Sequence, residues 1–321
     1  MSDERDIFDW LKQHAQPQQP SPEETERAQR RLEAAIAAEQ AIAHRRQTRR
    51  RPTTWIAAAA AVTVAVVALH PFLNRDQAEA ALGEIAEAAR EATPVDIPQG
   101  SFIYAESAGF NLVGRDADEF GLEGGSVSYL LPGTRKVWKS PDSDFVMLEV
   151  TYDQPTFFDP DAEAAYYRMG LDETDQVGET TREQFTGVTD PVDEINWPDN
   201  RDDLLDAMNT YLGTESPTTP ELVNLVVNLL RERNPSPQLK AAILEVLADL
   251  PIELVREDSE SITIGIIDAG RNQTFTLSRS GHLLAETATL IDGDPQAGIP
   301  PGTVTSRIEY QPIEVVEDLP D

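Results

Sequence analysis

A long uncharged apolar stretch near the N-terminus constrains this chain more than any other feature. Residues 53–73 contain no Asp, Glu, Lys or Arg. About 20 helical residues cross the roughly 30 Å hydrocarbon core of a bilayer, so the length fits one transmembrane helix. The side chains expected to lie in this span are Trp55, Ile56, Val62, Val64, Val66, Val67 and Leu69. We therefore expect one membrane-spanning helix over residues 53–73.

Basic residues on one side of this stretch indicate its orientation. The residues that precede it include Arg45, Arg46, Arg49, Arg50 and Arg51. Residues 74–93, which follow it, contain two basic residues. Because cytoplasmic segments next to a span carry an excess of Lys and Arg, the N-terminus is expected in the cytoplasm. The protein is then a single-pass protein of the cell membrane with an extracytoplasmic C-terminal domain.

Two other interpretations of the apolar stretch compete with a membrane anchor. A cleaved signal peptide has a short basic segment before its apolar core, whereas about 50 residues precede the stretch here. A buried helix of a soluble domain is also compatible with an apolar run near this length. The block of arginines before the stretch favours the membrane anchor over both.

Charge divides the chain into three parts. Residues 1–52 carry 10 basic and 9 acidic side chains, for a net charge of +1, and residues 53–73 carry none. Residues 74–321 carry 16 basic and 48 acidic side chains, for a net charge of −32. Such an acidic domain repels nucleic acid, so no direct nucleic-acid binding is expected. We expect a cytoplasmic helical arm (1–52), a transmembrane helix (53–73) and an acidic extracytoplasmic domain (74–321).

The cytoplasmic arm contains two amphipathic segments. The first presents Ile7, Phe8, Trp10 and Leu11. The second is expected to be a helix over residues 22–48, because Ser21, Pro22 and Glu24 form a capping-box start. One interpretation is an arm that places a helix in the groove of a cytosolic partner. The other is a stalk whose arginines only orient the span and contact anionic lipid.

The pattern beyond the span alternates between strands and helices. A helix is expected over residues 76–93, and strands over 101–107, 126–131, 135–140, 145–152, 261–268, 273–278, 282–291 and 303–310. Residues 132–134 and 141–144 have the composition of hairpin turns, and residues 153–200 are expected to be loops with a short helix near 162–169. Three capped helices are expected between residues 200 and 251. The fold class is therefore α+β, with a mostly antiparallel sheet and a three-helix insert.

Residue types that carry common enzyme chemistry are scarce. The chain has no cysteine, and its four histidines are far apart in sequence, at His14, His44, His70 and His282. Close acidic pairs occur at Asp142/Asp144, Asp159/Asp161, Asp202/Asp203/Asp206 and Asp292/Asp294. Their spacing matches no calcium loop, and close pairs are expected by chance in so acidic a domain. We expect no catalytic residue, no metal site and no cofactor.

Several segments together resemble one family of proteins. They are Pro20–Glu23 with the Arg-rich helix to residue 51, the Ala/Val span, Gly100–Glu106, Val137–Ser140, Pro198–Leu205, Ala242–Pro251 and the hairpin before Leu283. This set is similar to an uncharacterised family of actinobacterial single-pass membrane proteins, often encoded beside extracytoplasmic-function sigma factors. The resemblance implies an anti-sigma-like role. The chain lacks the His-x-x-x-Cys-x-x-Cys pattern of zinc-binding anti-sigma domains, which excludes that subtype.

Three functions follow as hypotheses. The first is a membrane regulator or signal-relay protein whose arm binds a cytosolic partner, such as a sigma factor, while its outer domain senses the state of the envelope. The second is a membrane-anchored extracytoplasmic module that binds an apolar ligand or lipid without catalysis. The third is an extracellular hydrolase that uses paired carboxylates, which would have to lie about 5–10 Å apart in a cleft.

Overall fold

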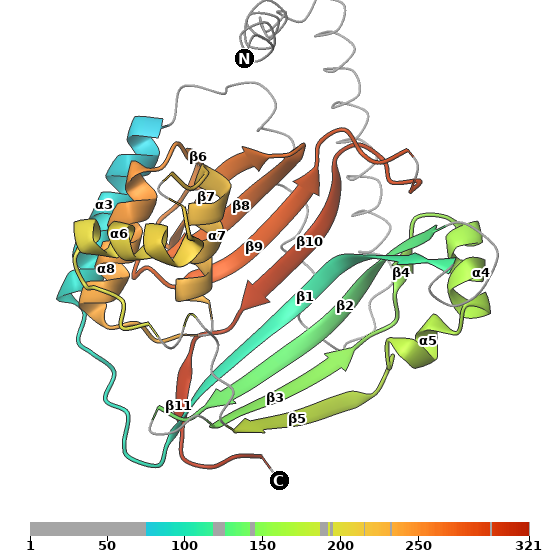
Figure 1. Cartoon of the computed structure of the whole chain (residues 1–321), viewed down its shortest axis with the longest axis horizontal. Helices are drawn as coiled ribbons and strands as arrows, with labels where there is room; N and C mark the ends of the chain where they lie inside the picture. The colour runs from blue at the N-terminus through green and yellow to red at the C-terminus, as the bar shows by residue number, and fades with distance from the viewer. Residues whose placement is uncertain are drawn as a thin grey trace, which may run out of the picture. The chain divides into compact units, whose positions relative to one another are not determined.

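The computed structural model describes residues 75–117, 126–141, 145–186, 192, 195–214, 216–231, 233–295 and 297–320. All of them belong to one unit of the chain, Leu69–Asp321. One curved antiparallel sheet with helices packed on it forms this unit (Figure 1). Within the described ranges, no helix has the length and apolar character needed to cross a membrane. The predicted span over residues 53–73 lies outside these ranges.

The sheet contains eleven strands. They are β1 (Phe102–Asp116), β2 (Ser126–Lys139), β3 (Phe145–Tyr152), β4 (Thr156–Phe157), β5 (Thr180–Thr186), β6 (Glu253–Glu257), β7 (Ser261–Asp268), β8 (Arg271–Ser278), β9 (Leu283–Leu290), β10 (Thr303–Tyr310) and β11 (Glu314–Val316). Their order is β5-β3-β2-β1-β10-β9-β8-β7-β6, while β4 pairs with β2 and β11 pairs with β1. The early and late strands of the sequence thus meet where β1 pairs with β10.

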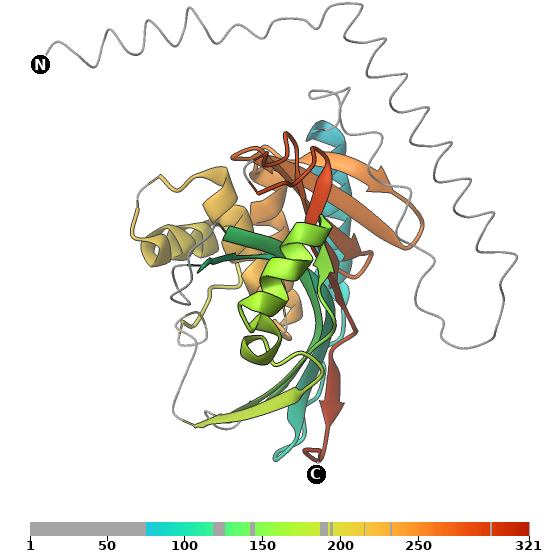
Figure 2. The ribbon, with the colours of Figure 1, turned by 90° about the vertical axis from the view of Figure 1, so that its right-hand side faces the viewer.

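Six helices accompany the sheet in the described part of the chain. They are α3 (Arg75–Glu91), α4 (Pro160–Arg168), α5 (Leu171–Thr174), α6 (Arg201–Leu212), α7 (Thr219–Leu230) and α8 (Pro237–Asp249). Helices α3, α6, α7 and α8 lie at the β6–β9 half of the sheet, and α4 and α5 lie at the far end of β1 and β2 (Figure 1). Figure 2 shows α6 and α7 on the side toward which the sheet curves.

Local capping explains where the inserted helices begin and end. The side chain of Asn200 accepts a hydrogen bond from Asp203 N, and Thr218 and Glu221 form a reciprocal capping box at the start of α7. Ser236 caps α8, with Pro237 in its first turn. Helix α6 ends at Gly213, whose φ of 67° is the left-handed conformation that favours glycine. The predicted three-helix insert is therefore confirmed.

The main hydrophobic core lies between these helices and one half of the sheet. Side chains that are almost completely buried there include Leu82, Ile243, Leu244, Leu247, Ile262, Ile264 and Phe275. They come from α3, α8, β7 and β8. Helix α3 contributes the predicted apolar face, since its Ala78, Leu82, Ile85, Ala86 and Ala89 are buried. Fully burying a large apolar side chain contributes about 1.5–3 kcal/mol, so this half is the better stabilised one.

A glycine pair lets the two longest strands bend. Gly109 of β1 faces Gly133 of β2. A Cβ on Gly109 would lie 1.9 Å from the carbonyl oxygen of Arg307, and one on Gly133 would lie 2.8 Å from that of Thr151. Because a side chain at either position would collide with a neighbouring strand, glycine permits the close approach that curls the sheet.

Two predictions about the first strand block are wrong. Residues 132–134 do not form a hairpin turn, because β2 continues through them, paired with β1 on one side and, at Gly133 and Thr134, with β3 on the other. The region 153–200 is not only loops and one helix, because β5 pairs with β3 along its length. The predicted short helix near 162–169 is confirmed as α4, and the predicted α+β class with a mostly antiparallel sheet is confirmed.

Candidate functional site

The helix-side surface of the sheet extends beyond the helices that cover it. Phe275 belongs to the core beneath α8 and pairs with Glu286 on β9, which pairs with Ile308 on β10. Ile308 pairs with Gly109, which pairs with Gly133. Directly paired residues lie on the same face of a sheet, so this row follows the helix side from β8 to β2. We call the helix-side surface of β1, β2, β3, β5 and β10 the concave face.

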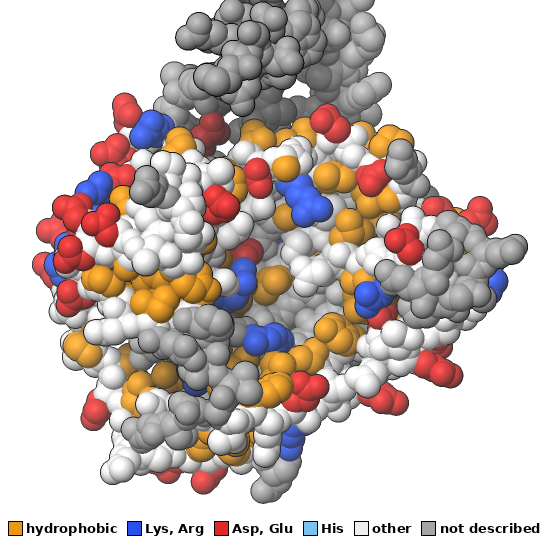
Figure 3. All heavy atoms as spheres, in the orientation of Figure 1, with side chains coloured by type: hydrophobic (Ala, Val, Ile, Leu, Met, Phe, Trp, Pro, Cys, Tyr) orange, Lys and Arg blue, Asp and Glu red, His pale blue; other side chains and the backbone are white. Residues whose placement is uncertain are grey.

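Figure 3 shows the molecule from this side. The surface is hollowed between the helical layer at the left and the α4–α5 end at the right. Hydrophobic and Lys/Arg side chains gather around the hollow, whereas Asp and Glu side chains gather mainly along the outer edges. The hollow therefore differs in character from the strongly acidic chain in which it lies.

Apolar side chains cover part of the concave face, where they alternate with Lys139 and Glu183. On β2 and β3 the register places Val137 beside Leu148 and Arg135 beside Val150, and on β3 and β5 it places Val146 beside Phe185. Val137 is buried, and Val146, Leu148, Val150 and Phe185 are partly exposed. Such a surface can hold the apolar part of a ligand, because ligand sites are mostly apolar with a few fixed polar groups.

A polar cluster lies where the helical layer meets the concave face. Arg231, at the end of α7, donates from Nε and Nη2 to the two carboxylate oxygens of Glu286, at 2.8 and 2.6 Å. The Tyr310 hydroxyl donates to Oε1 of the same carboxylate at 2.5 Å. Arg231 Nη1 also donates to Asn228 Oδ1 at 3.1 Å. The two-point contact fixes the guanidinium and the carboxylate in one plane, which holds both groups rigidly.

A second arginine approaches this cluster from β2. Arg135 and Tyr310 both pair with Ser107, so they lie on the same face with one strand between them. Burial lowers the pKa of Arg135, and the positive charge of Arg231 lowers it further. Burial also lowers the pKa of Arg231, but the hydrogen bonds and charge of Glu286 outweigh it and the pKa is raised. Burial and Glu286 raise the pKa of the Tyr310 hydroxyl. The cluster thus combines two guanidinium groups with the Glu286 side chain and the Tyr310 hydroxyl.

The far end of the concave face is closed by a small buried cluster. The carboxylate of Asp175 accepts hydrogen bonds from the hydroxyls of Tyr129 at 2.6 Å and Tyr166 at 3.3 Å. Arg115 Nη2 lies 3.5 Å from Asp175 Oδ1. The rings of Tyr129 and Tyr166 meet edge to face, with centroids 4.8 Å apart. These contacts hold α4 and α5 against β2, so we assign them a structural role.

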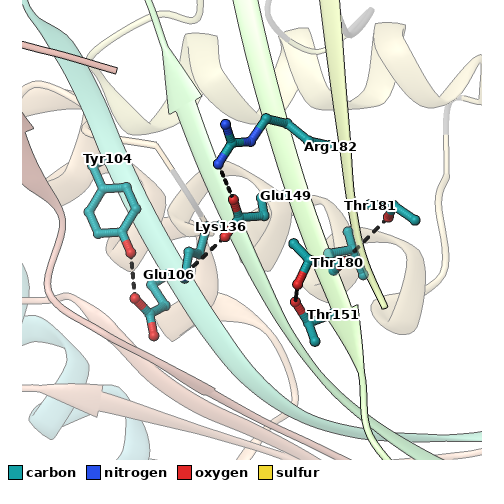
Figure 4. Close-up of polar contacts among 9 residues, drawn as sticks. Tyr104, Glu106, Lys136, Glu149, Thr151, Thr180, Thr181 and Arg182 are labelled. Atoms are coloured by element: carbon teal, nitrogen blue, oxygen red, sulfur yellow. Dashed lines mark hydrogen bonds and ion pairs between the residues drawn. The ribbon is translucent and has the colours of Figure 1, made fainter. Parts of the chain in front are cut away.

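The opposite face of the same strands carries a row of charged side chains paired in register, next to the buried side chains of Trp138 and Met147. Glu106, Lys136, Glu149 and Arg182 form one row across β1, β2, β3 and β5. Lys136 Nζ lies 3.0 Å from Glu149 Oε1, and Arg182 Nη2 lies 2.8 Å from Glu149 Oε2 (Figure 4). Hydrogen bonds from Arg182 and Lys136 lower the pKa of Glu149. Alternating charges in directly opposed positions stabilise strand pairing, so this row is structural.

An open depression lies away from the concave face, between α3 and α8. Its lining includes Asp76, Glu79, Arg201, Glu245 and Asp249. Arg201 contacts both Asp249 and Asp202, and Arg90 pairs with Glu245. These are surface ion pairs, which contribute little to the stability of the fold and do not indicate a ligand site.

The predicted membrane and partner residues lie outside the described part of the chain. This applies to the span residues Trp55, Ile56, Val62, Val64, Val66, Val67 and Leu69, to Arg45, Arg46, Arg49, Arg50 and Arg51, and to Ile7, Phe8, Trp10 and Leu11. The anchor, its orientation and the partner-binding segment therefore stay predictions.

The acidic pairs noted in the sequence have local structural roles where they are described. Asp159 caps α4 by accepting from Ala162 N at 2.7 Å, and Asp294 accepts from Ala297 N in a turn. Asp203 Oδ2 accepts from Asn200, at the start of α6. His282 lies beside Lys240, with Nδ1 3.4 Å from Nζ. Among the described residues, no group of three or more His, Cys, Asp or Glu side chains is arranged to hold a metal ion.

Sequence reasoning did not find the residues of the concave face. Arg135 was assigned only to a strand next to an expected turn, and Arg231 and Glu286 are 55 residues apart. One signal was available: Glu286 stands alone among Ala, Thr and Leu on β9, at a position whose β8 partner, Phe275, is apolar. A charged side chain facing inward needs a partner, because burying an isolated charge is costly.

Comparisons with known proteins do not add to this picture. No protein-family model matches the chain, and no curated protein matches it significantly.

Proposed function

We propose that residues 74–321 form an extracytoplasmic binding module for an apolar ligand, anchored by residues 53–73 and linked to a cytosolic partner by residues 1–52. The observation that supports binding is the concave face, where partly exposed apolar side chains of β3 and β5 line a hollow (Figure 3). Contiguous apolar surface of this kind marks interaction sites on soluble domains.

The exposure of apolar side chains on the inner face supports the same conclusion. An ordinary two-layer domain places polar side chains on the outer face of a sheet and covers the inner face. The outer face of β1, β2, β3 and β5 carries its row of paired charges next to Trp138 and Met147, which are themselves buried. The inner face keeps the apolar character of a core while its Leu148 and Val150 remain partly exposed. A bound apolar molecule would cover them.

The groups at the edge of the hollow suit binding rather than covalent chemistry. Arg231, Glu286 and Tyr310 are fixed by mutual hydrogen bonds, which favours orientation of a ligand. The proposed function therefore includes no catalytic step.

Site-specific labelling tests ligand binding. The chain contains no cysteine, so a single introduced cysteine can carry a polarity-sensitive fluorophore. Leu148→Cys places it on the concave face, and Thr151→Cys places it on the opposite face of the same strand. With full-length protein in phosphatidylcholine nanodiscs, a C16 fatty alcohol should shift the emission at position 148 and leave position 151 unchanged. Equal responses at both positions would contradict the proposal.

The link to a cytosolic partner rests on the sequence of the arm and on the resemblance to anti-sigma-like proteins. The full-length chain should retain a sigma factor in a pull-down from detergent-solubilised cells, and Phe8→Asp with Trp10→Asp should abolish this retention. Recovery of background proteins alone by the unaltered chain would exclude the regulator part of the proposal, while the ligand-binding part would stand on its own test.

A further inference from the structure

We propose that one end of the unit rests on the bilayer surface, where the exposed side chains of Ile267 and Ile291 enter the headgroup region. This end is formed by the start of α3, the β7–β8 hairpin and the residues after β9. The inference rests on the anchor proposed for residues 53–73 and concerns a surface separate from the concave face. The occupant is the membrane that holds that anchor.

A short connection ties the start of α3 to the proposed anchor. The apolar stretch ends at Leu73, and α3 begins at Arg75. Each residue step covers at most about 3.6 Å, so two steps keep the start of α3 at the bilayer surface. The rest of the unit must follow this helix, because its Leu82 and Ile85 are buried in the main core. The anchor therefore also determines which end of the unit is nearest to the membrane.

The β7–β8 hairpin lies at the same end as the start of α3. Arg75 Nη2 is 3.5 Å from the carbonyl oxygen of Asp249, the last residue of α8. Strand β6 begins soon afterwards at Glu253, which pairs with Gly265 near the end of β7. Ile267 is two residues further along β7, next to the hairpin turn. Figure 1 shows the start of α3 and the ends of β7 and β9 at the upper end of the unit.

Two exposed isoleucines flank this hairpin turn. The side chain of Ile267 is 61% exposed and that of Ile291 is 39% exposed. Ile291 N donates to the carbonyl oxygen of Gly270, in the turn, at 2.9 Å. Among the described residues, the exposed large aliphatic side chains are these two and Val95. Single exposed isoleucines are ordinary on soluble domains, but two at the end held against a bilayer can be buried there without any change of fold.

The contact is apolar rather than electrostatic. Asp268, Asp292 and Asp294 lie beside the two isoleucines in sequence, and they outnumber Arg271. Residues 74–321 also have a net charge of −32, so a surface of anionic lipid repels this unit. Burial of aliphatic side chains does not need a charged lipid. We therefore expect docking on phosphatidylcholine, and weaker docking as the fraction of phosphatidylglycerol rises.

Quenching by spin-labelled lipids tests the contact. The chain contains no cysteine, so Ile267→Cys or Ile291→Cys can carry one environment-sensitive fluorophore in the full-length protein. The protein is placed in phosphatidylcholine nanodiscs that contain a nitroxide either on the lipid head group or on the acyl chain. Both nitroxides should quench both positions, because side chains at the headgroup–acyl boundary lie about 5–10 Å deep.

Two further labelling positions serve as controls. Val95→Cys is matched in exposure, at 56%, and follows α3 at its other end. The 17 residues of α3 span about 25 Å, so neither nitroxide should quench this position. Gln77→Cys lies in the first turn of α3 and is exposed. The head-group nitroxide should quench it whenever residues 53–73 cross the bilayer, whether or not the isoleucines are inserted.

A second substitution measures the contribution of Ile267. With the fluorophore at position 291, Ile267→Ser should lower the ratio of docked to undocked protein about tenfold, as loss of one buried isoleucine predicts. The acyl-chain quenching at position 291 reports this ratio. Val95→Ser removes an aliphatic side chain of similar exposure from the other end of α3 and should leave the quenching unchanged.

The outcomes distinguish this inference from the anchor on which it rests. Quenching at Gln77→Cys without quenching at Ile267→Cys and Ile291→Cys would overturn the docking and leave the anchor in place. Equal quenching at Ile267→Cys and Val95→Cys, or equal effects of Ile267→Ser and Val95→Ser, would also overturn it. Absence of quenching at Gln77→Cys would overturn both the anchor and the docking.

Discussion

The two halves of the sheet use the same helix-side face in different ways. Beneath α8, the side chains of Ile262, Ile264 and Phe275 are at most 5% exposed and form part of one core with the helices. At equivalent positions on β3, Val146, Leu148 and Val150 are partly exposed. In the covered half, the helices pack on the apolar side chains of the sheet and stabilise it. In the open half, apolar side chains of β3 stay partly exposed. That difference is the basis for assigning a ligand to the open half.

The open half has other sources of stability. Glu149 joins Lys136 and Arg182 across three strands on the outer face, and Asp175 joins Tyr129 and Tyr166 at the far end. Neither set needs the concave face to be filled. A binding surface can therefore stay uncovered without loss of the strands that carry it.

Truncation of core side chains should separate the two halves most strongly. Ile264→Ala removes a fully buried side chain and should lower the free energy of unfolding by about 4 kcal/mol. Val150→Ala removes a partly exposed one and should lower it by about 1 kcal/mol. Urea unfolding followed by circular dichroism measures both. Equal losses would mean that the open half is as much a structural core as the covered half.

Substitution of Gly109, where β1 approaches its neighbouring strand closely, should lower the free energy of unfolding almost as much. Gly109→Ala places a methyl group 1.9 Å from the carbonyl oxygen of Arg307 and should lower the free energy of unfolding by about 3 kcal/mol. Gly114→Ala on the same strand meets no atom within 4 Å and should change it by about 0.5 kcal/mol or less. Similar melting temperatures for the two variants would show that the sheet does not depend on close approach at Gly109.

The ion pair at the boundary of the two halves should contribute less than the core. Glu286→Gln weakens the contacts with Arg231 and Tyr310, and should cost about 2 kcal/mol, because the Glu286 side chain is only 15% exposed. Arg90→Gln breaks a pair whose members are 48% and 32% exposed and should cost about 0.5 kcal/mol or less. The melting temperatures of the two variants at low and high salt measure both costs. If salt changes the effect of Glu286→Gln more than that of Arg90→Gln, this ranking is contradicted.

The smallest predicted effect concerns pH and the outer face of the open half. The pKa of Glu149 is lowered by Arg182 and Lys136, so its ionised form stabilises the fold above the pKa of the unfolded residue. This contribution, about 1 kcal/mol, is lost as the pH falls through the lowered folded-state pKa. Because Glu149→Gln has no carboxylate to protonate, its stability should fall less than that of the unaltered protein below about pH 4.5. Arg182→Gln removes one of the two partners of Glu149 and should remove only part of this pH-dependent contribution. Urea unfolding at several pH values measures both variants.

Some features were predictable because their causes are local. The capping residues Asn200, Thr218 and Ser236 lie within three residues of the amides they bind, so the sequence alone placed the starts of α6, α7 and α8. Strand β5 was missed because Thr180–Thr186 has one apolar side chain, and only its pairing with β3 makes it a strand. The turn expected at 132–134 was wrong because pairing with β1 and β3 overrides the local preference of Pro and Gly.

The sequence by itself determined the charge division, the apolar stretch at 53–73, the α+β class and the starts of α6, α7 and α8, because each depends on residues close together in the chain. Only the tertiary structure decided the candidate site. The pairing of β1 with β10 joins strands about 200 residues apart, and with them Arg135, Arg231, Glu286 and Tyr310. Apart from Glu286, which stands alone among Ala, Thr and Leu on β9, each of these residues is ordinary in its own segment. Their proximity results from long-range strand pairing and from helix packing, which no local pattern encodes.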